Sequence, residues 1–158
     1  MNKWILFILT LAFTAYWASN LFLWFPWSYS TALGITLMLT ISPVLWAYFS
    51  YLGLKTYPKA NLMIGAFTIA LAFLLFSVIM DFIFFGLIRN AMEGLYHPTT
   101  FYGYGFLLVL PLLLAVIFRK KILKKKKTVT HQEMIKVGIS GLFFFGILTS
   151  IIIFGIQI

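Results

Sequence analysis

The feature that most constrains this chain is a series of apolar runs long enough to cross a lipid bilayer. The run from Leu62 to Ile88 contains a single charged residue, Asp81. As an α-helix it would be about 40 Å long, whereas the hydrocarbon core of a bilayer is about 30 Å thick. The whole sequence is 63% hydrophobic and 9% charged, but soluble domains are only about half apolar and about a quarter charged. The sequence therefore predicts an all-α integral membrane protein.

Polar and helix-breaking residues divide the apolar sequence into five expected transmembrane helices. These helices are Trp4–Phe25, Ser30–Leu54, Asn61–Ile88, Phe101–Phe118 and Met134–Ile158. The segment Phe25–Ser28 contains Pro26 and is expected to be a tight turn between the first two helices. Residues 119–133 are expected to form a basic loop. Because almost every residue belongs to a span or a short connection, we expect residues 1–158 to form a single transmembrane domain, one bundle of five helices.

The distribution of positive charge predicts the orientation of this bundle. The chain has twelve Lys and Arg residues. If the N-terminus is cytoplasmic, all of them except Arg89 fall on the cytoplasmic side, as the positive-inside rule requires. We therefore expect a cytoplasmic N-terminus and an external C-terminus. The compact chain and its strong charge bias suggest a bacterial cytoplasmic membrane.

Asp81 is the principal candidate for a functional residue. It lies about 28 Å along its helix from the cytoplasmic entry at Leu62, and therefore near the outer boundary of the bilayer. Asn20 and Tyr102 are expected at a similar depth in other helices. Because polar side chains within spans usually face the bundle interior or a hydrated cavity, the sequence predicts a shallow, outward-facing pocket. Asp81 would form its floor, and Asn20 and Tyr102 its walls.

Two charged residues and a histidine follow Asp81 on the outer side: Arg89, Glu93 and His97. Arg89 and Glu93 would face each other if the helix continued past Ile88. Glu93 and His97 have a spacing that suits two metal ligands on one helix, but no third ligand lies nearby in the sequence. We therefore expect no metal and no cofactor. In a pocket protein, these three side chains would contact the ligand.

The segment from Tyr102 to Gly105 contains the tripeptide Gly-Tyr-Gly that also occurs in potassium-channel selectivity filters. In those filters the tripeptide follows a pore helix, and its loop supplies backbone carbonyls to the ion. Here the preceding loop is too short for a pore helix. The glycines are more simply interpreted as allowing close packing of the fourth helix.

The basic loop is a candidate binding site for anionic lipid headgroups. The partners of the protein would then be membrane lipids. Its positive residues are Arg119, Lys120, Lys121, Lys124, Lys125, Lys126 and Lys127. The interpretation that we favour is that these charges only retain the loop in the cytoplasm. Nucleic-acid binding is not expected, because no interleaved recognition surface is visible. The absence of cysteine excludes disulfides and thiolate chemistry.

Three functions are compatible with these patterns. The first is a non-enzymatic accessory or structural component of a membrane complex, which would associate with another membrane protein or with itself. The second is a ligand-binding or transport module that uses the pocket around Asp81. The third is a membrane enzyme acting on a lipid or quinone headgroup, since an interfacial carboxylate, arginine and histidine are suited to such chemistry.

Overall fold

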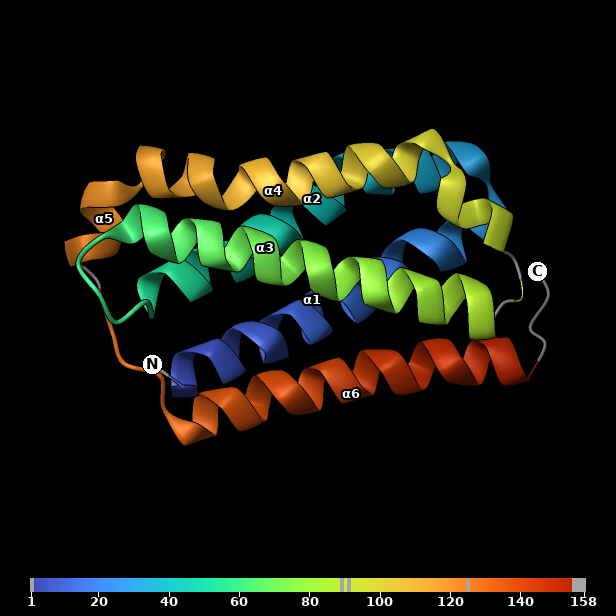
Figure 1. Ribbon diagram of the computed structural model, residues 1–158. Helices are drawn as coiled ribbons and strands as arrows, with labels where there is room; N and C mark the ends of the chain where they lie inside the picture. The colour runs from blue at the N-terminus through green and yellow to red at the C-terminus, as the bar shows by residue number, and fades with distance from the viewer. Residues whose placement is uncertain (1, 89, 91, 125, 155–158) are drawn as a thin grey trace.

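The structure is a computed structural model that describes residues 2–88, 90, 92–124 and 126–154. The described residues form helices and connections, without any strand. Five helices are long and apolar enough to span a membrane. They are α1 (Asn2–Tyr29), α2 (Thr31–Lys55), α3 (Leu62–Asp81) with its π-helical continuation η1 (Phe82–Ile88), α4 (Pro98–Ile117) and α6 (His131–Ile153) (Figure 1). Two short helices connect them: the 3₁₀-helix η2 (Met92–Tyr96) and α5 (Arg119–Lys124).

The first connection differs from the sequence prediction. The segment Phe25–Ser28 is helical rather than a turn, and α1 continues through Pro26 to Tyr29. Proline removes only one backbone donor from a helix, and the helix resumes beyond it because the Ser30 amide donates to the Pro26 carbonyl at 3.0 Å. The chain turns at Ser30, whose side chain caps α2 by accepting from the Leu33 amide.

The other helix limits are close to the expected ones. Side chains cap the starts of these helices: Asn61 precedes α3, His97 precedes α4 and Thr130 precedes α6. Of the three, Asn and Thr are typical N-cap residues. Thr130 forms a capping box with Glu133, so the expected loop at 119–133 is shorter than predicted and α6 begins at His131. The same loop also contains α5. The end of the fifth expected span, residues 155–158, lies outside the described residues.

The five long helices run back and forth along one axis, which gives the bundle two ends (Figure 1). We call the end that holds Lys3, Lys55 and α5 the lysine end. We call the opposite end, which holds Asp81 and the start of α4, the Asp81 end.

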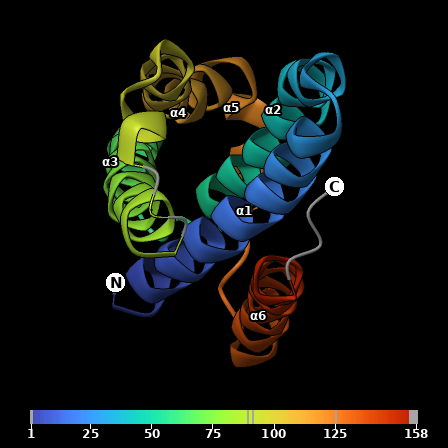
Figure 2. The same cartoon turned by 90° about the vertical axis from the view of Figure 1, so that its right-hand side faces the viewer.

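Helix α1 is the central helix of the bundle, and α6 lies at its edge (Figure 2). In the most apolar stretch of α1, 56% of the residues are buried, whereas in that of α6 only 11% are buried. Helix α1 packs against α2, α3 and α6, whereas α4 packs against α2 and α3. Thus α1, α2, α3 and α4 form the group that surrounds the interior, and α6 lies against the outer side of α1.

The interior of the bundle is filled with apolar side chains over most of its length. Phe73, Ile69 and Ala66 of α3 are completely buried, as are Leu11 and Ala12 of α1. Close packing of this kind excludes water. A polar site within the described helices is therefore to be sought near the ends of the bundle rather than at its middle.

Candidate functional site

Asp81 lies between α1 and α4 at the residue where α3 ends and η1 begins. The Tyr16 hydroxyl of α1 donates to its Oδ1 atom at 2.7 Å, and the Tyr104 hydroxyl of α4 donates to its Oδ2 atom at 2.7 Å. Both distances lie in the ordinary range of a hydroxyl hydrogen bond. Each carboxylate oxygen therefore has one donor and retains the capacity to accept a second hydrogen bond.

The two tyrosines are themselves held in place. Tyr16 is 3% exposed, and its ring packs edge-on against Trp17 with the ring centroids 5.1 Å apart. Asn20, one turn further along α1, donates to the Tyr16 carbonyl at 3.0 Å. Tyr104 is partly exposed and lies on the first half of α4. The carboxylate is thus bracketed by one buried and one accessible hydroxyl.

A hollow of about 210 Å³ opens beside this carboxylate and is lined by α1, α2, α3, η1 and α4. Asp81, Tyr16 and Tyr104 line it together with Ser19 and Ser77. The hydroxyls of Ser19 and Ser77 are buried, and neither has a hydrogen-bond partner among the described residues. Buried hydroxyl groups are normally paired. In this hollow the two hydroxyls and the carboxylate are the groups available to a polar ligand or to ordered water.

A second hollow, of about 360 Å³, continues the first towards the Asp81 end of the bundle. The two hollows share six lining residues: Asn20, Leu23, Met38, Phe85, Thr99 and Thr100. The second is also lined by His97 and Trp27. We call the two hollows together the Asp81 pocket. Its described lining contains one carboxylate and neither lysine nor arginine.

The structure places some of the predicted pocket residues differently. Asn20 lines the pocket as expected, although its amide binds the α1 backbone rather than Asp81. Tyr102 is 78% exposed and lines neither hollow; Tyr104 takes its place beside Asp81. The reason is helical geometry, because residues two apart in a helix point to nearly opposite sides.

The polar residues beyond η1 are only partly associated with the pocket. His97 lines its outer hollow, and its Nδ1 atom lies 2.8 Å from the Thr99 hydroxyl. Glu93 is exposed on η2 and lines neither hollow. Arg89 lies outside the described residues. The helix that would have paired it with Glu93 does not continue, because η1 ends at Ile88 and Asn90 has a positive φ of 49°.

Two interpretations from the sequence concern ion binding at this end of the bundle. The described residues contain no group of three or more His, Cys, Asp or Glu side chains that could hold a metal ion. The segment from Tyr102 to Gly105 is α-helical. Its backbone carbonyls therefore do not form the extended loop of a selectivity filter.

Sequence reasoning missed Tyr16, Tyr104, Ser19 and Ser77. Tyr16 could have been recognised from the sequence, because its hydroxyl is a polar group within an apolar run and it lies one turn before Asn20. The serines gave no signal, because a serine in an apolar helix commonly bonds to its own backbone.

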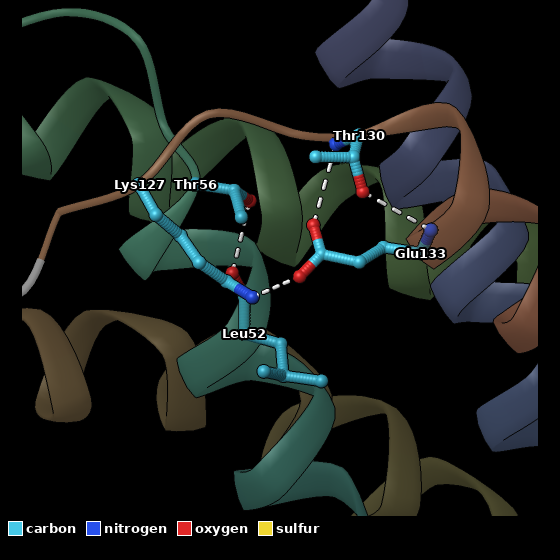
Figure 3. A network of polar contacts seen from close by, with 5 residues as sticks. All are labelled: Leu52, Thr56, Lys127, Thr130 and Glu133. Carbon is cyan, nitrogen blue, oxygen red and sulfur yellow. Dashed lines mark hydrogen bonds and ion pairs between the residues drawn. The ribbon is translucent and has the colours of Figure 1, made fainter.

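The lysine end has a polar network of its own (Figure 3). Lys127 forms an ion pair with Glu133, whose carboxylate also accepts from the Thr130 amide. The Lys127 amide donates to the Lys55 carbonyl at 3.1 Å, which joins the basic loop to the end of α2. The predicted headgroup residues that the structure describes are all exposed: Arg119, Lys120, Lys121, Lys124, Lys126 and Lys127. Lys125 lies outside the described residues.

No protein family, no curated protein and no solved structure matches this chain. Any functional conclusion therefore rests on the geometry of the described residues.

Proposed function

We propose that this chain is an integral membrane protein that binds a small cationic or hydrogen-bond-donating molecule in the Asp81 pocket. In this proposal the N-terminus is cytoplasmic, and the pocket opens to the outer side of a bacterial cytoplasmic membrane. The observation that carries the proposal is the Asp81 carboxylate, which is held by Tyr16 and Tyr104 at the floor of a hollow with unpaired hydroxyls.

The polarity of the pocket supports a ligand with hydrogen-bonding groups. An unpaired buried hydroxyl costs about 1–3 kcal/mol. A ligand that pairs with Ser19 and Ser77 would therefore gain affinity from groups that the folded chain leaves unsatisfied. Ligand sites usually combine an apolar lining with a few such polar groups.

The charge of the pocket supports a cation or a neutral donor rather than an anion. Asp81 provides negative charge, and no lysine or arginine of the described lining offsets it. Trp46 and Phe85 line the same hollow, and aromatic faces also attract cations. A protonated amine would accordingly be favoured over a carboxylate or phosphate.

The interior supports binding rather than transport across the bundle. Between Asp81 and the lysine end, α3 presents Phe73, Ile69 and Ala66, all completely buried. A polar ligand bound at Asp81 would meet this packed apolar interior.

Enzymatic use of Glu93 is also disfavoured, because that side chain is exposed and lies outside both hollows.

Charge-selective labelling of an engineered cysteine tests the proposal directly, and the natural chain has no cysteine to interfere. Ser77→Cys places a thiol in the hollow with little change in volume. Because the Ser77 side chain is buried, its labelling requires the reagent to enter the hollow. We expect a membrane-impermeant cationic thiosulfonate added from outside to modify Cys at position 77 faster than an anionic one, on the order of tenfold, because of the nearby carboxylate. The added substitution Asp81→Asn should remove this preference.

The control is Tyr102→Cys, which lies at the same end but outside the pocket. At position 102, the ratio of the cationic to the anionic labelling rate gives the intrinsic difference in reactivity between the two reagents. The same ratio at position 77 is divided by this value. Equal normalised ratios at both positions would disprove a cation-selective pocket, and failure of both reagents to modify position 77 would disprove a hollow that is open to molecules of their size.

An accessory role in a membrane complex is the second candidate, and the exposed α6 favours it. Only 11% of the most apolar stretch of α6 is buried inside the bundle, so most of its surface is available to lipid, another membrane protein or a second copy. This role would be favoured over ligand binding if the cysteine at position 77 is not labelled and Asp81→Asn retains full biological activity.

A further inference from the structure

A hollow of about 680 Å³ lies at the lysine end. Its lining comes from three segments far apart in the sequence. They are the start of α1 (Lys3, Trp4), the α2–α3 connection (Thr56, Tyr57, Pro58) and the α5–α6 connection (Lys126, Lys127, Thr128, Val129). We call it the lysine pocket. It is separate from the Asp81 pocket, at the other end of the bundle.

The aromatic wall of the lysine pocket is rigidly built. The indole Nε1 of Trp4 donates to the Gly53 carbonyl at 3.0 Å, and its ring packs against Tyr57 with centroids 4.8 Å apart. Tyr57 lies so close to Gly65 that an added Cβ there would be 2.7 Å from the tyrosine ring. Trp4 and Tyr57 are only 4% and 3% exposed. The wall is therefore held by helix packing and does not depend on an occupant.

The opposite wall is basic and is fixed by backbone contacts. The Lys127 amide donates to the Lys55 carbonyl, and the Lys126 ammonium donates to the Lys59 carbonyl. Glu133 pairs with Lys127 and neutralises one of the three lysines that line the hollow. Lys3 and Lys126 supply the remaining positive charge, and a lysine ammonium has three donors, so Lys126 can bind a further acceptor.

We propose that the lysine pocket binds the phosphate of an anionic phospholipid headgroup. Lys3 and Lys126 would contact the phosphate oxygens, and the buried rings of Trp4 and Tyr57 would form the fixed wall beside them. A basic hollow with an aromatic wall at the end of spanning helices suits a headgroup, because anionic lipids attract lysines and aromatic rings favour the interface. This inference depends on the proposed membrane location but not on the Asp81 pocket.

The test compares two double variants that remove the same charge. Lys3→Gln with Lys126→Gln removes both unneutralised lysines of the pocket. Lys120→Gln with Lys124→Gln removes two exposed lysines of α5 that do not line it. Binding of phosphatidylglycerol to the full chain in detergent is measured by native mass spectrometry and by thermal stabilisation, with phosphatidylcholine as the neutral lipid.

We expect phosphatidylglycerol, but not phosphatidylcholine, to stabilise the natural chain. The pocket variant should bind phosphatidylglycerol on the order of tenfold more weakly, while the α5 variant should retain most of the affinity. Equal losses in both variants would show an unspecific basic surface and overturn the proposal.

Inorganic phosphate alone, added without lipid, distinguishes the source of the anion. Stabilisation by phosphate with the same dependence on Lys3 and Lys126 would show a site for a free anion and overturn the lipid assignment. Asp81→Asn is measured in parallel and should bind phosphatidylglycerol like the natural chain. The two proposals therefore fail separately: a negative result here leaves the labelling of position 77 unaffected.

Discussion

Asp81 accepts a hydrogen bond at each carboxylate oxygen, and the two donors belong to different helices. This arrangement reduces the cost of placing a carboxylate among apolar side chains, because charge-assisted hydrogen bonds are about twice as strong as neutral ones. It also ties α1, α3 and α4 together at one point. The same residue therefore serves stability and, in our proposal, recognition.

Removing one of the two donors should measure its contribution. In Tyr104→Phe, the Oδ2 atom of Asp81 loses its donor from α4 while the apolar ring remains. We expect a loss of about 1–3 kcal/mol in the free energy of unfolding, measured by denaturant titration in detergent. Tyr102→Phe is the matched control, since its exposed side chain is not near Asp81 and should change stability by less than about 0.5 kcal/mol. Equal stabilities of the two variants would contradict a contribution from the Tyr104 hydroxyl.

At the scale of single residues, the end of the bundle at which Asp81 lies could be predicted, whereas the orientation of the neighbouring side chains could not. Counting the helical rise from Leu62 put Asp81 near the end of its span, and the structure has it at the end of α3 opposite the lysine end. Which of Tyr102 and Tyr104 faces Asp81 depends on the rotation of α4 about its axis. An apolar helix with polar residues at neighbouring positions does not define that rotation, because both faces can lie against apolar surroundings.

Helix α3 changes its geometry at Asp81, where the α-helix passes into the π-helix η1. A π-helix is wider than an α-helix, and such segments occur frequently at functional sites. Here the change falls directly after the carboxylate, and Phe85 of η1 lines the Asp81 pocket. The sequence predicted one continuous helix over Asn61–Ile88. Hydropathy gives the length of an apolar run but not the hydrogen-bonding pattern within it.

Helix α6 is held to the bundle by a close contact with α1. The Thr14 hydroxyl of α1 donates to the Val137 carbonyl of α6 at 2.8 Å. At Gly141, an added Cβ would lie 2.6 Å from the Phe13 ring and 2.7 Å from the Thr14 hydroxyl oxygen. Glycine at this position lets the two helices approach, as small residues do in membrane helix pairs.

Gly141→Ala should therefore weaken the packing of α6 on α1. We expect a loss of about 1–3 kcal/mol from overpacking, together with slower disulfide formation between cysteines introduced at an α1–α6 contact. Gly146→Ala is the control, because an added Cβ there has no neighbour within 4 Å, and alanine favours the helix. If both substitutions have the same effect, the close contact at Gly141 does not determine how α6 packs.

At the scale of the whole molecule, the spans could be predicted but their arrangement could not. Five helices of bilayer length follow from run lengths alone, and the part of the chain that the structure describes contains five such helices. That α1 is central and α6 peripheral follows from side-chain complementarity, such as Gly141 against Phe13. The lysine pocket was likewise not predictable, since its lining joins three segments that are distant in sequence.

The separation of charge between the two ends also determines how both proposals relate to the membrane. The lysine end holds Lys3, Lys55 and the exposed positive residues of α5, and the opposite end holds Asp81. If the positive-inside rule governs insertion, the lysine pocket faces the cytoplasm and the Asp81 pocket faces outwards. The reverse insertion would exchange the two environments.

Cysteine accessibility in intact cells tests this orientation without background labelling, because the chain contains no cysteine. We expect an impermeant maleimide to label Tyr102→Cys in intact cells, and Lys124→Cys only after the membrane is permeabilised. Both side chains are exposed, at opposite ends of the bundle, so a difference between them reports the side of the membrane rather than burial. Labelling of position 124 but not 102 in intact cells would reverse the orientation. Labelling of both positions without permeabilisation would contradict an arrangement in which the five helices span one bilayer with their ends on opposite sides.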